Sequence, residues 1–228
     1  MSESSESSAV PADKPFPIVV LISGSGSNLQ AIIDSFSDTE PSINIRAVIS
    51  NNPEAYGLQR ARQSGITTRV INHRDFPDRS SYDAALMAEI DSHQPELVVL
   101  AGFMRILTTE FVNHYSGRLI NIHPSLLPLY PGLNTHQQAI ENGDTEAGAT
   151  VHFVTPEVDE GPIIIQARVP VFKTNSSNDL ASRVLQQEHS IYPKAIRWAA
   201  QGRLTVQNGN VLLDGKQSPK QQVSSDDK

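Results

Sequence analysis

Short apolar runs alternate with amphipathic stretches through the first half of the chain. The runs are rich in Val, Ile and Leu, which is typical of strands buried on both faces of a parallel sheet, and they occupy residues 18–22, 43–49, 67–71, 97–101 and 119–122. Patterns of helical periodicity lie between them, over residues 28–36, 55–64, 82–92 and 109–115. Gly65 follows the second pattern, where a helix commonly ends in a left-handed residue. Because strand and helix alternate, we expect parallel strands joined by right-handed crossovers.

The pattern changes after residue 148 to two longer extended runs, at 149–155 and 162–172. A turn that contains Asp159 and Gly161 joins them, so we expect antiparallel strands here. Further on, the dipeptide Asn208-Gly209 lies between two short apolar runs and predicts a hairpin. The predicted fold class is therefore α/β, with a Rossmann-like open sheet that is parallel in its N-terminal half and gains antiparallel strands in its C-terminal half.

One domain with two tails is the expected organisation. The chain has 228 residues, a length that suits one core, which we place at 17–215. The polar segments 1–16 and 216–228 are expected to be disordered tails. Within the domain, residues 177–200 predict a long helix opened by Ser and Asn caps, and Pro193 marks the place for a kink.

Composition favours small-molecule substrates over a nucleic acid. The chain has 25 acidic and 18 basic residues, and no run of Lys and Arg that would suit a phosphate backbone. The absence of cysteine excludes disulfides, a thiolate nucleophile and Cys-ligated zinc. No His-x-x-x-His pair occurs, so we expect no metal. No apolar stretch approaches the ~20 residues of a membrane span, and the N-terminus does not resemble a signal peptide, so we expect a cytoplasmic protein without a membrane partner.

Candidate catalytic residues lie in the run Leu119–Pro128 and in the later turn. Asn121 and His123 are two residues apart at the end of a predicted strand, so their side chains share one face. An amide can donate to a developing oxyanion, and an imidazole can move protons near pH 7. A carboxylate beside the imidazole would favour its protonated form and fix its orientation, a role that we assign to Asp159. The alternative is an ordinary polar strand end.

The segment Ser23–Asn28, of sequence Ser-Gly-Ser-Gly-Ser-Asn, lies between the first predicted strand and the first helix. Its backbone amides and the helix N-terminus would direct positive partial charge to one point, which suits a phosphate. Leu29 occupies the place of the third glycine in a dinucleotide-binding loop, so a phosphate monoester is the better fit. The alternative is a tight glycine turn in which Asn28 merely caps the helix.

Several longer motifs occur in order along the chain. They are Leu21–Leu29, Ala101–Leu107, Asn121–Pro128, His152–Thr155, Val158–Pro162 and Gln187–Pro193. Together they resemble the folate-dependent phosphoribosylglycinamide formyltransferases of purine synthesis, and the likeness extends from Pro17 to Gly215. The first and last motifs are more particular to this family than the Asn/His/Asp set, which other formyltetrahydrofolate-using enzymes share. Leu129 and Asn134 depart from the family pattern, which has a basic residue and a histidine there.

The resemblance implies transfer of the formyl group of 10-formyltetrahydrofolate, as cosubstrate, to the amine of phosphoribosylglycinamide. It implies that the catalytic residues are Asn121, His123 and Asp159, and that the Leu127–Pro128 bond is cis. The residues implied to bind phosphoribosylglycinamide are Gly26, Ser27 and Asn28 for the phosphoribosyl group and Glu188 for the ribose hydroxyls. Those implied to bind folate are Arg79, Met104, Arg105, Ile106, Leu107, Asn121, Thr155 and Glu160. From the residues alone, the two arginines could equally be solvated surface charges.

Three other functions stay open at this point. A methionyl-tRNA formyltransferase would be expected to bring a further C-terminal domain and a basic face, and a formyltetrahydrofolate hydrolase a regulatory domain before the first strand. A non-catalytic nucleotide-binding module would need only the glycine loop. Direct attack by the acceptor amine is favoured over a formyl-enzyme, because the chain has no cysteine and shows no activated serine constellation. A monomer and a homodimer are both compatible with the sequence.

Overall fold

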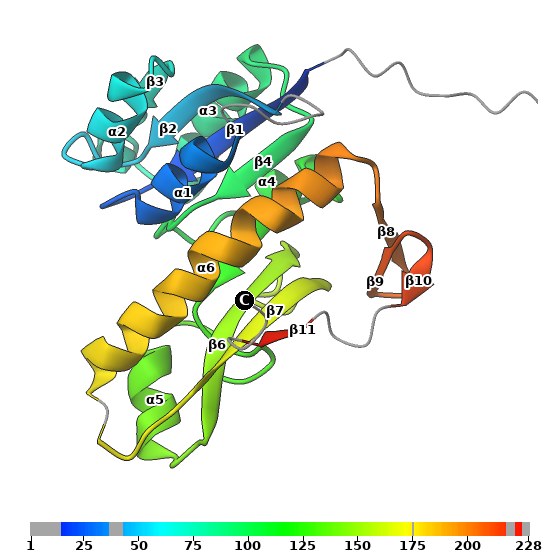
Figure 1. Ribbon diagram of the computed structural model, residues 1–228. Coiled ribbons are helices and arrows are strands. Elements are labelled where there is room, and N and C mark those ends of the chain that lie inside the picture. Colours follow the sequence, from blue (N-terminus) through cyan, green and yellow to red (C-terminus); the bar gives the residue numbers. More distant parts are fainter. Residues whose placement is uncertain (1–14, 37–42, 175, 218–221, 225–228) are drawn as a thin grey trace, which may run out of the picture.

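The computed structural model describes residues 15–36, 43–174, 176–217 and 222–224 (Figure 1). Within these residues the main sheet has eight strands in the order β11-β7-β6-β5-β4-β1-β2-β3. The parallel half is formed by β1 (Phe16–Ile22), β2 (Ile43–Ser50), β3 (Thr68–Val70), β4 (Leu97–Leu100) and β5 (Leu119–His123). The strands β6 (Glu146–Phe153) and β7 (Ile163–Pro170) continue the sheet antiparallel to β5 and to each other, and β11 (Gln222–Ser224) pairs parallel to β7. The predicted fold class is confirmed.

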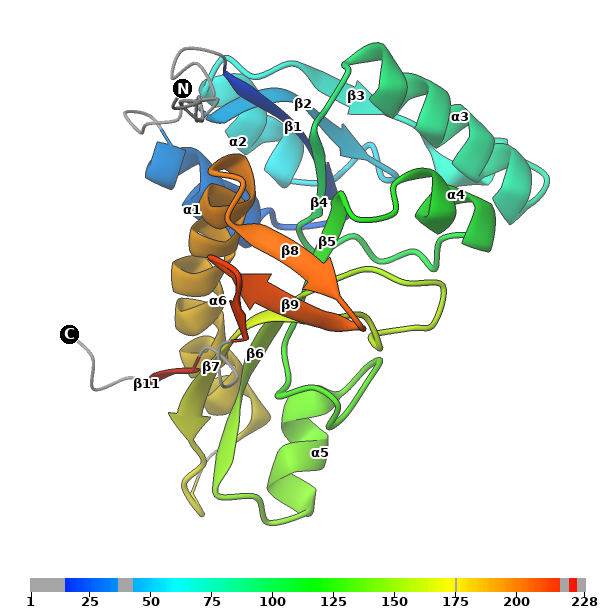
Figure 2. The same ribbon diagram turned by 90° about the vertical axis from the view of Figure 1, so that its right-hand side faces the viewer.

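Helices cover both faces of the sheet. They are α1 (Ser27–Phe36), α2 (Gly57–Gln63), α3 (Arg79–Ser92), α4 (Thr109–His114), α5 (Thr135–Glu141) and α6 (Ser177–Ala200), with a 3₁₀ turn η1 (His73–Asp75). Alternate side chains of β1 point to opposite faces, so Ile18 and Val20 pack with α1, α2, α5 and α6, whereas Val19 and Leu21 pack with α3 and α4. Figure 2 shows α1 and α6 on one side of the strands, and α3 and α4 on the other.

Helix α6 is unbroken through Pro193, so the predicted helix 177–200 is confirmed and the proline does not end it (Figure 1). Its start is fixed by a capping box, in which the Ser176 hydroxyl accepts the N–H of Asp179 and the Asp179 carboxylate accepts the N–H of Ser176. The helix packs against β6, β7 and α1. Glu188, near its middle, is thereby placed beside the start of α1.

Two local predictions differ from the structure. Helix α5 was not predicted, because Ala139 is its only buried apolar residue and the stretch lacks a clear apolar stripe. Helix α3 begins at Arg79, three residues before the predicted start, because the Asp78 carboxylate accepts the N–H of Ser81 at 2.8 Å and caps it. Arg79 therefore lies in the first turn of a helix.

Turn predictions agree with the backbone. Gly65 has φ +71° directly after the C-cap of α2, and Asn208 and Gly209 both have positive φ in the turn between β8 (Leu204–Gln207) and β9 (Asn210–Leu213). The Leu127–Pro128 bond is cis, as the resemblance implied. The small sheet of β8, β9 and β10 (Lys216–Gln217) follows the C-terminal end of α6 (Figure 2).

The two predicted tails fall mostly outside the described residues. This holds for residues 1–14 of the N-terminal tail and for 218–221 and 225–228 of the C-terminal one. In the described remainder of the second tail, β10 pairs with β9, and β11 pairs parallel to β7. No helix in the described part of the chain is long and apolar enough to cross a membrane.

Candidate active site

Three separate segments bring Asn121, His123 and Asp159 together. The first two end β5, and Asp159 lies in the turn between β6 and β7. Because β6 runs antiparallel to β5, the C-terminal residues of β6 pair with Asn121 and its neighbours. The turn after β6 therefore begins close to Asn121. His123 Nδ1 lies 3.4 Å from Asp159 Oδ2, so the predicted imidazole–carboxylate pair is formed although 36 positions separate the residues in the sequence.

Both ring nitrogens of His123 face acceptors. Nε2 donates to the carbonyl oxygen of Tyr130 at 2.8 Å, and Nδ1 faces the carboxylate of Asp159. The side chain is buried, with 5% of its surface exposed. A neutral imidazole can donate from only one nitrogen, whereas the imidazolium donates from both. The arrangement therefore suits the protonated ring, held ready to give a proton from Nδ1.

Asp159 is held in place by its own loop and by the loop after β5. Its backbone has a left-handed φ of +58°, which few residues other than glycine, asparagine and aspartate adopt. Oδ2 accepts the N–H of Gly132 at 2.9 Å. This hydrogen bond joins the β6–β7 turn to the segment that supplies the Tyr130 carbonyl, so the two partners of His123 are fixed relative to each other.

His152 orients the amide of Asn121. The register of β5 and β6 places the two residues opposite each other, and Asn121 Nδ2 lies 3.3 Å from His152 Nε2. His152 Nδ1 donates to the carbonyl of Phe153 at 2.9 Å, so Nε2 is the acceptor nitrogen of the ring. Burial lowers the pKa of His152 and keeps the ring neutral. One amide hydrogen of Asn121 is thereby held by His152, and the other is left for a substrate oxygen.

A buried polar network supports the chain around the cis proline. The Thr150 hydroxyl donates to the carbonyl of Ser125 at 2.7 Å and accepts the N–H of Leu127 at 3.1 Å. Gln166 Nε2 donates to Thr150 Oγ1 and to the carbonyl of Leu127, both at 2.9 Å. These hydrogen bonds fix the beginning of the segment whose later residues, Tyr130 and Gly132, contact His123 and Asp159.

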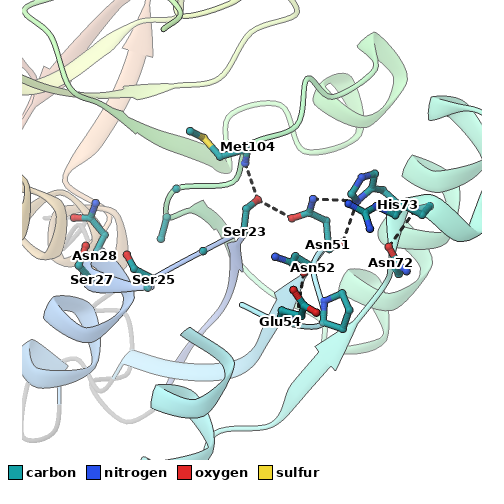
Figure 3. A pocket seen from close by; sticks show the side chains of 16 residues that line it. Ser23, Ser25, Ser27, Asn28, Asn51, Asn52, Glu54, Asn72, His73 and Met104 are labelled. Carbon is teal, nitrogen blue, oxygen red and sulfur yellow. Dashed lines mark hydrogen bonds between the residues drawn. The ribbon is translucent and has the colours of Figure 1, made fainter. Parts of the chain in front are cut away.

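The predicted phosphate loop, Ser23–Asn28, opens into a cavity of about 570 Å³ (Figure 3). Gly26 has φ +70°, and a Cβ added there would lie 2.5 Å from Gly57 Cα, so a glycine is required by conformation and by packing. The opposite wall is polar and comes from the carboxyl ends of β2 and β3. The residues of that wall are Asn51, Asn52, Pro53, Glu54, Asn72, His73 and Arg74.

Asn28 and Glu188 form a polar pair at the start of α1. Asn28 Nδ2 donates to Glu188 Oε2 at 2.7 Å, and both side chains are buried. Burial raises the pKa of Glu188, and the hydrogen bond from Asn28 opposes this only in part. Asn28 Oδ1 is buried without a partner. A ligand with adjacent hydroxyl groups would supply the donors that this pair lacks.

The residues Met104 to Leu107, which the resemblance implies bind folate, do not all face a ligand. Met104 and Ile106 are 70% and 63% exposed, as apolar contacts for a ligand would be. Leu107, in contrast, packs on the core under α3 and α4. The guanidinium of Arg105 lies 5.4 Å from the ring centre of Tyr82, so this side chain packs on α3 and is not a free surface charge.

Comparison with known proteins decides the family. Residues 16–196 match the family described as formyl transferase. The chain belongs to this formyl transferase family. It is 56% identical over 210 residues to phosphoribosylglycinamide formyltransferase of Escherichia coli (strain K12), which covers 92% of the chain and 99% of that protein. The enzyme of the same name from Haemophilus influenzae is 47% identical over 203 residues, which covers 89% and 96%.

Solved structures agree with the sequence matches. The phosphoribosylglycinamide formyltransferase of Coxiella burnetii, determined in complex with CHES, has a TM-score of 0.87 and 52% identity, covering 92% of this chain and 99% of that one. Glycinamide ribonucleotide transformylase 1 of Symbiobacterium toebii has a TM-score of 0.84 and 45% identity, covering 87% and 94%. The resemblance inferred from the motifs is confirmed.

Some site residues of this formyl transferase were not predicted. His152 was part of a motif but was given no role, and only the strand register reveals that it faces Asn121. Ser23 belongs to the predicted phosphate loop, but its contacts were not predicted. Its Oγ accepts the N–H of Met104 at 2.7 Å and donates to Asn51 Oδ1 at 2.6 Å, which links the segments after β4 and β2 (Figure 3).

Three predicted folate residues gain little support from side-chain geometry. Thr155 bonds only within its own turn, to the carbonyl of Glu157 at 3.3 Å. Arg79 and Glu160 are exposed, and no hydrogen bond or ion pair of their side chains is recorded within the described ranges. Among the described residues, no group of three His, Cys, Asp or Glu could hold a metal ion.

Proposed function

We propose that this formyl transferase transfers the formyl group of 10-formyltetrahydrofolate to the amine of 5-phosphoribosylglycinamide, giving formylglycinamide ribonucleotide and tetrahydrofolate in purine (IMP) biosynthesis. The observation that carries the proposal is the His123–Asp159 pair beside Asn121, in a chain that aligns over 92% of its length with an enzyme of this name. A phosphate-type loop at the same edge of the sheet suits the phosphorylated acceptor.

The acceptor is bound by its phosphate and its ribose. The N-terminus of α1 and the amides of Gly26, Ser27 and Asn28 bind the phosphate. The carboxylate of Glu188 and the unpaired Oδ1 of Asn28 accept hydrogen bonds from the ribose hydroxyls. The amine then points toward His123 at the end of β5.

The cosubstrate supplies an activated formyl group, and its pterin packs on the exposed side chains of Met104 and Ile106. Asn121 donates its free amide hydrogen to the formyl oxygen as negative charge develops there. The amine attacks the formyl carbon, the bond between that carbon and N10 of the folate breaks, and the proton that the amine loses ends on N10. His123 shuttles a proton through Nδ1 during this exchange, and Asp159 stabilises the charged ring. Transfer is direct, since the chain has no cysteine and no activated serine is seen at the site.

An acceptor panel tests the reaction. Purified protein is mixed with 10-formyltetrahydrofolate and phosphoribosylglycinamide, methionyl-tRNA or water alone, and tetrahydrofolate formation is followed by absorbance. We expect rapid turnover only with phosphoribosylglycinamide. His123→Ala is the inactive control. Turnover with methionyl-tRNA would identify a tRNA formyltransferase, turnover with water alone a hydrolase, and no turnover with any acceptor a non-catalytic binding module.

We also propose that the partners are small molecules only, without nucleic acid or membrane, and that the protein acts in the cytoplasm. The acidic composition supports this, because a nucleic-acid surface concentrates basic residues. Cell fractionation with activity assays tests the location, and an excess of activity in the membrane fraction would contradict it. Light scattering at several concentrations distinguishes a monomer from a homodimer, both of which suit the fold.

A further inference from the structure

Helix α2 donates hydrogen bonds to the phosphate loop, Ser23–Asn28, on the side away from the cavity. The carbonyl of Gly24 accepts the N–H of Gly57 at 3.0 Å, and the carbonyl of Ser25 accepts Arg60 Nε at 2.9 Å. In a trans peptide unit the C=O and the following N–H point in opposite directions. The N–H groups of Ser25 and Gly26 therefore point away from α2, toward the cavity that these two residues line.

These two N–H groups are not used by the protein. Among the hydrogen bonds recorded for the described residues, neither group donates to a backbone or side-chain acceptor, and Gly26 is buried. A buried N–H requires an acceptor. Two adjacent N–H groups on one side of a turn form a concavity suited to an anion. Both N–H groups are therefore available to donate to the oxygens of the phosphate that the proposed acceptor carries.

Arg60 is itself fixed by two further contacts. Its Nη1 donates to Gln30 Oε1 of α1 at 3.3 Å, and its guanidinium lies 4.9 Å from the ring centre of Tyr56. Burial is the main cause that lowers the pKa of His189, and the positive charge of Arg60 lowers this pKa further, so His189 lies near the guanidinium. The guanidinium is therefore a fixed positive charge that connects α1, α2 and the loop between β1 and α1.

We propose that Arg60 is the positioning residue of the phosphate subsite. It does not touch the phosphate: it holds the Ser25 carbonyl, so that the Gly26 N–H faces the ligand, and it places positive charge behind the loop, which favours a dianion. The proposal rests on the proposed acceptor, phosphoribosylglycinamide. It predicts that Arg60 makes the enzyme selective for an acceptor that carries a phosphate.

Two acceptors and three variants test this role. Initial rates are measured with phosphoribosylglycinamide and with the unphosphorylated ribosylglycinamide, for wild type, Arg60→Gln, Arg60→Lys and Arg62→Gln. For Arg60→Gln the KM for the phosphorylated acceptor should rise about tenfold or more, as expected for loss of a charge-assisted hydrogen bond. The kcat, the folate KM and the kcat/KM for the unphosphorylated acceptor should stay within about twofold. Arg60→Lys, which keeps the charge and one donor, should be intermediate.

Arg62→Gln is the matched control, since Arg62 is on the same helix but bonds to Thr68 Oγ1 at 3.2 Å and not to the loop. It should behave like wild type. Equal losses with both acceptors in Arg60→Gln, or no loss with either, would overturn the proposal. If Arg60→Gln lacks a native melting transition, Arg60→Lys decides alone, and inorganic phosphate binding by calorimetry must weaken in it. A wild type that fails to formylate phosphoribosylglycinamide contradicts the proposed function instead.

Discussion

At the scale of single residues, neighbours decide which protonation state each buried side chain can adopt. His123 and His152 are both buried histidines near Asp159, yet their contacts differ. His123 has an acceptor at each nitrogen, whereas His152 uses Nε2 as an acceptor for Asn121. One imidazole is thus suited to donate a proton and the other to hold an amide. Sequence spacing predicts that such residues are present but not which role each takes.

Replacing Asp159 with asparagine tests the charge at this site. The side chain of the Asp159→Asn variant can still accept the N–H of Gly132 through its oxygen, but it lacks the negative charge that favours the imidazolium. We expect kcat to fall about a hundredfold, in the range of general acid catalysis, while both KM values change little. An unchanged kcat would exclude the proposed role of Asp159.

Glu188 should show opposite effects on stability and on binding. Because burial raises its pKa, the native state binds the proton more tightly than the unfolded state, and stability falls as pH rises through that pKa. At neutral pH the buried carboxylate therefore costs stability. Glu188→Gln should raise the melting temperature at neutral pH. It should also increase the KM for phosphoribosylglycinamide about tenfold, because the ribose hydroxyls lose their hydrogen bonds to a charged carboxylate.

Kinetics at several pH values check the same residue. The acceptor KM of the wild type should rise as pH falls through the raised pKa of Glu188, because the protonated carboxyl loses acceptor capacity. In Glu188→Gln this dependence should disappear. A variant that is less stable than wild type, and that keeps the pH dependence, would show that Glu188 does not contact the ribose.

At the scale of elements, close approach between α2 and the β1–α1 loop determines the sequence of the loop. A Cβ at Gly26 would lie 2.5 Å from Gly57 Cα, and a Cβ at Gly57 would lie 2.6 Å from the side chain of Ile22 and 3.1 Å from Gly26 Cα, so neither glycine can carry a side chain without displacement of its neighbours. The same helix provides the donors for two loop carbonyls. The glycines are therefore explained by packing as much as by the phosphate, and substitution of Gly26 cannot test phosphate binding by itself.

Gly26→Ala and Gly24→Ala separate these effects on stability. At Gly26 the left-handed φ and the contact with Gly57 should cost about 1–3 kcal/mol of unfolding free energy. At Gly24 an added Cβ meets nothing within 4 Å, so the change should stay within about 0.5 kcal/mol. Denaturant unfolding of both variants gives the two values. Equal stabilities would show that the loop relaxes around the new methyl group.

Elements with strong periodicity could be predicted from the sequence, and those defined by loops or register could not. The parallel strands and α6 were predicted with nearly correct bounds because each has a continuous apolar run or stripe. Helix α5 was missed because Ala139 is the one apolar residue that it buries. The start of α3 was missed because the Asp78 cap begins the helix three residues earlier than the apolar pattern does. The role of His152 depends on strand register, which no local pattern reveals. Similarly, the packing of Arg105 on Tyr82 is a tertiary contact.

At the scale of the whole molecule, the two halves of the sheet contribute different parts of the site. The parallel half provides the phosphate loop after β1 and the apolar wall after β4. The antiparallel half provides His152 and the turn with Asp159. The residues Asn121 and His123 lie on β5, which borders both halves. Binding and proton transfer should therefore be separable by substitution.

Gly161→Ala tests this separation. A Cβ at Gly161 would overlap the carbonyl oxygen of Phe153, so the β6–β7 turn must move and carry Asp159 with it. We expect kcat to fall about a hundredfold because a small displacement of a catalytic group is costly, while inorganic phosphate binding, measured by calorimetry, stays unchanged. Gly209→Ala is the control, since its φ of +75° also makes a side chain unfavourable, but in the turn between β8 and β9, so it should leave kcat intact. Weaker phosphate binding in Gly161→Ala would show that the two halves are coupled, because a turn of the antiparallel half would then be shaping the loop after β1.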